Sequence, residues 1–150
     1  MLILKDDLAI SDTEMTYDRD DILKGLSNVG YEDDPDFLEG TFDKSRMGIL
    51  TNLVEYKFKK SKTYYMQENS SRIKHYINKL CKYQPFWDLE DVQEGEVIYA
   101  MYLAGFDAKR KGDRAYFKIT PYSCHKLYSE ANIAEHDFHE NQYINNVKRR

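Results

Sequence analysis

The chain has little of what marks several large classes of protein. Among its 150 residues are only 2 Cys, 3 Pro, 7 Gly and 1 Trp. No apolar run approaches the roughly 20 residues that cross a bilayer, and the start MLILKDDLAI lacks the basic flank and cleavage site of a signal peptide. Cys81 and Cys124 form no CxxC pair, so we expect buried, reduced thiols and no disulfide framework. We therefore expect an intracellular, cytoplasmic protein that does not enter a membrane.

Motifs of several enzyme classes are also missing. The chain contains no GxSxG, no P-loop and no GxGxxG, so the sequence does not support a serine hydrolase or a nucleotide-binding enzyme. It has no internal repeat, no low-complexity tract and no linker rich in Gly, Pro or Ser. With 41% hydrophobic residues, a chain of this length can bury one ordinary core. We expect a single domain over residues 1–150.

What the chain does have is charge of alternating sign along its length. Residues 1–43 hold 13 acids and 3 bases, whereas residues 44–82 hold 2 acids and 10 bases. Residues 83–108 hold 6 acids and no base, and residues 109–128 hold 1 acid and 6 bases. Such bands could fold into an acidic pocket beside basic rims, or they could be solvated faces of an ordinary soluble protein. The net charge of −4 is unusual for a protein that holds nucleic acid.

Periodicity predicts a mixed α+β fold around a small central sheet. We expect a strand or arm over 1–10, a helix over about 12–26, and a hairpin of strands over 36–42 and 49–58. A basic helix over 69–83 should bury Ile73, Ile77 and Leu80 and leave Arg72 and Lys79 in water. The stretch 89–106 is also rich enough in β-branched and aromatic residues for a strand, but we favour a helix closed by Gly105. A hairpin turning at residues 111–113 and a helix starting at Thr120-Pro121 complete the prediction.

The predicted hairpin brings two acids and a lysine together. If Phe42 and Ile49 pair across the loop, Asp36 lies directly opposite Glu55, and Lys57 shares the face of Glu55. Two carboxylates facing each other are unfavourable unless a cation lies between them, and hard oxygen ligands suit Mg²⁺. A bound Mg²⁺ would polarise a phosphodiester, and a nearby ammonium would orient the attacking water.

On these residues the chain resembles the PD-(D/E)xK nuclease superfamily. Pro35-Asp36 is similar to the first half of the motif and Glu55-Tyr56-Lys57 to the second, over a nuclease-like core of about residues 10–85. The resemblance implies a Mg²⁺-dependent endonuclease of the small phage or Holliday junction resolvase type, with Asp36, Glu55 and Lys57 as catalytic residues. It also implies a metal-binding acid in the first helix, for which Glu14, Asp18 and Asp21 are candidates. Residues 86–130 would then form a helix, a hairpin and a helix, followed by a C-terminal segment over 131–150.

Two basic clusters beside tyrosines are candidates for binding DNA. Their cations are Lys59, Lys60, Lys62, Lys109, Arg110, Lys111 and Arg114. They could contact a phosphate backbone, or they could be lysines that keep a hairpin edge soluble. A third cluster, of Cys124, His125, His136 and His139, fits no common zinc spacing, and we expect these residues to have a structural or surface role.

Two functional hypotheses follow from these patterns. The first is a Mg²⁺-dependent nuclease that hydrolyses DNA. The second is a non-catalytic inhibitor or regulator of the phage type, which binds a host protein or nucleic acid through its acidic and basic bands. The sequence leaves a homodimer open under either hypothesis.

Overall fold

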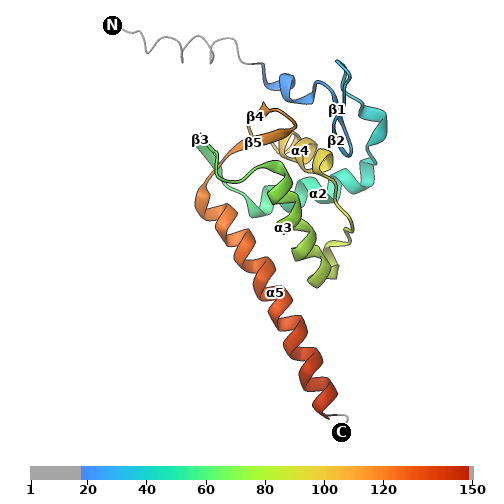
Figure 1. The fold of residues 1–150 in the computed structure, drawn as a ribbon, viewed down its shortest axis with the longest axis vertical. Helices are drawn as coiled ribbons and strands as arrows, with labels where there is room; N and C mark the ends of the chain where they lie inside the picture. The colour runs from blue at the N-terminus through green and yellow to red at the C-terminus, as the bar shows by residue number, and fades with distance from the viewer. Residues whose placement is uncertain (1–17, 149–150) are drawn as a thin grey trace, which may run out of the picture.

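The computed structural model describes the backbone of residues 18–148 and the side chains of residues 18–144. The predicted strand or arm over 1–10 lies outside the described residues, as does the first part of the predicted helix over 12–26. The elements along the chain (Figure 1) are η1 (Arg19–Leu23), β1 (Leu26–Ser27), β2 (Gly30–Tyr31), η2 (Glu39–Thr41), α2 (Lys44–Lys57), β3 (Lys60–Tyr65), α3 (Ser70–Tyr83), η3 (Pro85–Trp87), α4 (Glu94–Leu103), β4 (Ala108–Lys111), β5 (Arg114–Ile119) and α5 (Pro121–Lys148). From residue 18 on, the predicted helix over 12–26 is wrong, because the segment forms the short 3-10 helix η1 and the start of β1.

The fold is α+β, as predicted, and its larger sheet has three antiparallel strands in the order β3-β5-β4. β4 and β5 form the predicted hairpin, in which Gly112 adopts a φ of +61° at the turn. β5 is the central strand, because β3 pairs with its other edge. The strand β3 was not predicted. Its pairing with β5 is interrupted by a bulge between Lys60 and Tyr65, so it shows no regular alternation of apolar residues.

Residues 44–57 form the helix α2, so the predicted hairpin over 36–42 and 49–58 is wrong. Asp43 caps the helix, and its Oδ1 accepts hydrogen bonds from the backbone N–H groups of Ser45 (2.9 Å) and Arg46 (3.3 Å). The buried side chains are Met47, Leu50, Leu53 and Val54, whose spacing places them on one side of a helix. This side packs against α4.

The helix α3 lies where the sequence predicts it and buries the predicted side. Asn69 is its N-cap, and Ile73, Ile77 and Leu80 are fully buried. Its largest contact is with α5, and it also touches α4 and β5. The side chain of Arg72 is 62% exposed, as expected, whereas that of Lys79 is 27% exposed because its ammonium pairs with Glu135 of α5 at 2.9 Å.

The helix α4 starts against the β1–β2 hairpin. The backbone N–H of Glu96 donates to the carbonyl of Asn28 (3.1 Å), and a Cβ on Gly95 would lie only 1.8 Å from the carbonyl oxygen of Ser27. The helix ends before Gly105, which has a φ of +90°, so the predicted helical reading of this stretch is confirmed. The close approach at Gly95 fixes the hairpin on the helix N-terminus.

The core joins α2, α3, α4, the inner face of the sheet and the first half of α5. Its largest fully buried side chains include Phe117, Leu26, Leu50, Ile77, Met101 and Leu127. Cys81 and Cys124 are buried and free, as predicted. Within residues 18–148, no helix is both long enough and apolar enough to span a bilayer.

Candidate nucleic-acid interface

The residues of the predicted nuclease motif lie on a loop and on a helix. Asp36 is exposed in the loop between β2 and η2, and its carbonyl accepts a hydrogen bond from the N–H of Gly25 (2.9 Å). Glu55 and Lys57 lie on α2, where a separation of two residues turns the side chains about 200° apart. The strand pairing that would place Asp36 opposite Glu55 is therefore not formed, and the geometry on which the expected magnesium site was based is lost.

Lys57 instead joins α2 to α5. Its side chain is only 12% exposed, and its Nζ lies 3.0 Å from Oε1 of Glu130. The same ammonium lies 5.3 Å from the ring centre of Tyr56 and 5.8 Å from that of Trp87. This environment gives Lys57 a structural role. Catalysis by Asp36, Glu55 and Lys57 stays a prediction, without the geometry on which it was based.

Of the predicted metal ligands, the structure describes Asp36, on a loop, and Glu55, on α2. Glu14 lies outside the described residues. Among residues 18–144, no group of three or more His, Cys, Asp or Glu side chains has an arrangement that could hold a metal ion. His136 and His139 are exposed on α5, and His125 hydrogen-bonds through Nε2 to the Tyr65 hydroxyl at 3.0 Å. The magnesium ion stays a prediction.

Six of the seven predicted DNA-binding cations, in contrast, lie on one sheet, and Lys59 directly precedes it. All seven are exposed. In the register of the sheet, Lys60 lies beside Ile119 at one end of β5, whereas the cluster at 109–114 lies on β4 and at the other end of β5. The two clusters are about 50 residues apart in sequence, so only the folded sheet joins them. The sheet lies at one end of the molecule, next to the start of α5 (Figure 1).

Alternation along β5 divides these cations between two faces. Ala115, Phe117 and Ile119 are buried, so the intervening residues face outward. In the register of the hairpin, Lys109 lies opposite Tyr116 and Lys111 lies opposite Arg114. We name the outward set of Lys109, Lys111, Arg114, Tyr116 and Lys118 the basic sheet face. All of its charged side chains are cations.

Tyr64 of β3 extends the basic sheet face. The Nζ atoms of Lys109 and Lys118 lie 4.8 Å and 5.1 Å from the centre of its ring, so the aromatic ring attracts one cation from each of the other two strands. The cation–ring contacts hold these lysines at the surface of the sheet. Tyr64, Tyr116 and Lys118 were missing from the predicted set, although the alternation of polar and apolar residues over 114–119 could have indicated the last two.

Arg110 lies on the opposite face from the basic sheet face. It is paired with the buried Ala115, and its guanidinium lies 3.8 Å from the centre of the Tyr31 ring. Burial raises the pKa of Tyr31, and the Arg110 charge opposes this effect. Arg110 therefore covers the β1–β2 hairpin and is a poorer candidate for binding DNA than its neighbours Lys109 and Lys111.

Carboxylates compensate some of the cations on the basic sheet face. Arg114 lies 3.4 Å from Glu94, whose other oxygen accepts a 2.5 Å hydrogen bond from Ser70. Lys118 lies 4.0 Å from Asp107. Within residues 18–144, Lys109 and Lys111 form no ion pair with a carboxylate. These two lysines are therefore the cations most available to an anionic ligand.

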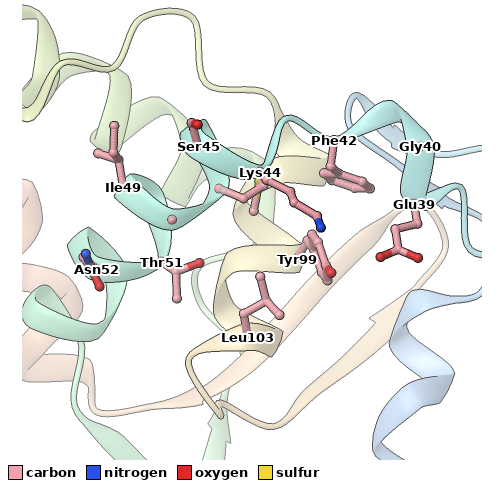
Figure 2. Close-up of a pocket in the computed structure, with 12 residues that line it drawn as sticks. Glu39, Gly40, Phe42, Lys44, Ser45, Ile49, Thr51, Asn52, Tyr99 and Leu103 are labelled. Atoms are coloured by element: carbon pink, nitrogen blue, oxygen red, sulfur yellow. The ribbon is translucent and has the colours of Figure 1, made fainter.

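A groove with a volume of about 1100 Å³ lies elsewhere, between η2, α2 and α4. Phe42 packs on Tyr99 with ring centres 4.7 Å apart, and Figure 2 shows the side chain of Lys44 pointing toward both rings. Glu39 lines the same groove, so its two charged residues are of opposite sign. The basic sheet face suits a polyanion better than this groove does.

Comparison of the chain with protein families, curated proteins and solved structures found no match.

Proposed function

We propose that this protein binds single-stranded nucleic acid with the basic sheet face and does not need catalysis to act. The observation that carries the proposal is the presence of four cations and Tyr116 on one outward face, with Tyr64 beside them. Cations spaced along a strand can neutralise successive phosphates, and the counterions they release favour binding. This proposal takes the nucleic-acid-binding form of the non-catalytic alternative in the sequence analysis, and the basic sheet face supports it.

The aromatic residues favour a single strand over a duplex. Tyr116 lies on the central strand, directly opposite Lys109. A base of a single strand can stack on such a ring while its phosphates reach the flanking lysines, whereas the bases of a duplex are already stacked on one another. The acidic bands elsewhere in the chain repel the same backbone, which would confine the nucleic acid to the sheet.

The test measures binding of fluorescently labelled single-stranded and duplex DNA of equal length at several salt concentrations. We expect tighter binding to the single strand, with an affinity that falls as salt rises. The double variant Lys109→Ala, Lys111→Ala should bind more weakly and lower the slope of log affinity against log salt by about 0.7 for each lysine. Tyr116→Leu should weaken single-strand binding while leaving the salt slope unchanged, because it removes stacking and no charge.

Lys82→Ala is the matched control, because Lys82 is an exposed lysine at the far end of α3 from the sheet. It removes one charge and should leave the salt slope as it is in the wild-type protein. The proposal fails if the wild-type protein binds neither DNA, if it prefers the duplex, or if the double variant binds as the wild type does.

A further inference from the structure

The outward side of α5 carries a stripe of large apolar residues that the core does not use. Tyr122, Ile133 and Ile144 are 71%, 59% and 40% exposed. They are eleven residues apart, which is close to three full turns, so the stripe drifts by only about 20° at each step. Lys126 and Glu140 lie within the same stripe, seven positions before and after Ile133. We name these five residues the outer stripe.

The outer stripe lies on the opposite side of α5 from its contact with α3. The inward side chains are Cys124, Leu127, Ala131 and Ala134, all of them buried. Their 3-4-3 spacing is that of a helix packed along one seam. The apolar residues of the outer stripe are therefore additional to those that hold α5 in the fold.

The helix α5 also continues past the element that supports it (Figure 1). The last ring contacts with α3 join Tyr83 to Phe138 and to His139, with centres 5.2 Å and 5.8 Å apart. Nine residues of helix follow His139, about 14 Å in length, and the described side chains from Glu140 to Ile144 are all exposed. A helical end of this length is marginal in water without packing, so a partner would stabilise it.

We infer that the outer stripe is the interface of an antiparallel homodimer centred on Ile133. Facing residues of two antiparallel helices lie equal numbers of positions on either side of the dyad. Tyr122 therefore faces Ile144 of the partner subunit, and Lys126 faces Glu140 of the partner subunit. Each of these pairs occurs twice by symmetry, and Ile133 packs against its own copy.

Electrostatics selects the antiparallel arrangement over the parallel one. In a parallel pair each residue faces its own copy, which opposes Lys126 to a lysine and Glu140 to a glutamate. In the antiparallel pair these residues form two ion pairs of opposite sign. Ser129 and Asp137, four positions on either side of Ile133, behave in the same way, because the hydroxyl can donate to the carboxylate only across an antiparallel pair. The charges along the outer stripe are thus complementary to those of a second copy that runs in the opposite direction.

The first test is the oligomeric state of the full chain by sedimentation velocity over a range of concentrations. We expect a reversible dimer. Ile133→Glu should raise its dissociation constant by about a hundredfold or more, because it places two negative charges against each other at the dyad. Phe86→Glu is the matched control: Phe86 is 75% exposed, lies outside α5, and receives the same change of charge. Circular dichroism checks that each variant keeps its helix.

The second test fixes the orientation of the helices. Lys126→Glu and Glu140→Lys should each weaken the dimer, and the double variant should restore it, because the ion pair is re-formed with its signs exchanged. In a parallel dimer each of these variants would still oppose like charges, as the wild-type protein does, so neither single variant would weaken it. The inference is overturned by a monomer at all concentrations, by a dimer that is insensitive to Ile133→Glu, or by a double variant that remains as weak as the single ones.

Discussion

Two glycines in helices should respond in opposite directions to the same substitution. Gly48 lies inside α2, and a Cβ built on it meets no atom within 4 Å. Gly95 lies in the first turn of α4, where the same Cβ would lie 1.8 Å from the carbonyl oxygen of Ser27 and 2.7 Å from backbone atoms of Asn28. Gly48→Ala should therefore stabilise the protein, and Gly95→Ala should destabilise it.

The magnitudes follow from these two environments. Alanine is favoured over glycine inside a helix by about 1 kcal/mol, and nothing at Gly48 opposes this gain. At Gly95 the added Cβ would overlap backbone atoms of Ser27 and Asn28, which cannot rotate away as a side chain can. The β1–β2 hairpin must therefore move from the helix by more than about 1 Å to restore ordinary van der Waals distances. That movement breaks the hydrogen bond from Glu96 to Asn28 and opens the packing, at a total cost of about 3 kcal/mol. The two variants should differ by about 4 kcal/mol in the free energy of unfolding.

Urea denaturation followed by far-ultraviolet circular dichroism measures both variants against the wild-type protein. We expect the midpoint to rise for Gly48→Ala and to fall for Gly95→Ala, with similar slopes. A Gly95→Ala protein as stable as wild type would refute the close packing of α4 on the hairpin. A Gly48→Ala protein that is less stable than wild type would show that α2 has a neighbour at this position.

Two further predictions concern buried polar groups. Lys57→Ala should lower the free energy of unfolding by about 2 kcal/mol, because it leaves Glu130 without its partner and removes packing between α2 and α5. Substitution of the exposed Lys59 by alanine should change this free energy by less than about 0.5 kcal/mol. Equal urea midpoints for these two variants would contradict the structural role of Lys57. Burial raises the pKa of Cys81 to about 11 and that of Cys124 to about 12, from an ordinary value of 9.0. The fold therefore holds protons that the unfolded chain releases above pH 9, so the urea midpoint should fall as the pH rises from about 9 to about 11, and a midpoint that stays constant or rises would contradict this assignment.

Elements with strong local signals could be predicted from the sequence. The helix α3 combines a polar cap with Ile73, Ile77 and Leu80 on one side, and the β4–β5 hairpin has a glycine turn between alternating residues. The start of α5 was also predicted, from Thr120 as a cap followed by Pro121. The structure confirms this start, because the Thr120 hydroxyl accepts a hydrogen bond from the N–H of Ser123 (3.2 Å). In each case the residues that define the element lie within a few positions of one another.

The prediction failed at α2 because two signals in the same segment disagree. Ile49, Thr51 and Val54 are β-branched, and Gly48 interrupts the segment, so local propensity favours a strand. Asp43 as a cap and the helical spacing of the buried residues favour a helix, and packing against α4 decides the outcome. The assignment of Glu55 and Lys57 to a catalytic strand depended on this one choice.

The candidate site could be predicted only in part. The basic clusters are visible in the sequence as runs of lysine and arginine, and their exposure follows from their charge. That they lie on one sheet depends on the pairing of Lys60 with Ile119 and of Tyr65 with Phe117. Pairing across such a separation leaves no local pattern, and the bulge in β3 removes the alternation that would have marked it as a strand.

The central position of β5 has a consequence for the order in which the chain folds during synthesis. β3 ends at Tyr65, but the strand that pairs with it begins at Arg114, and the seam of α3 is completed only by α5. Closing so long a loop costs entropy before any contact repays it. In a nascent chain, Ile73, Ile77 and the unpaired edge of β3 therefore stay exposed to solvent until the last elements leave the ribosome. The fold of the earlier elements is completed only when the C-terminal third of the protein has been made.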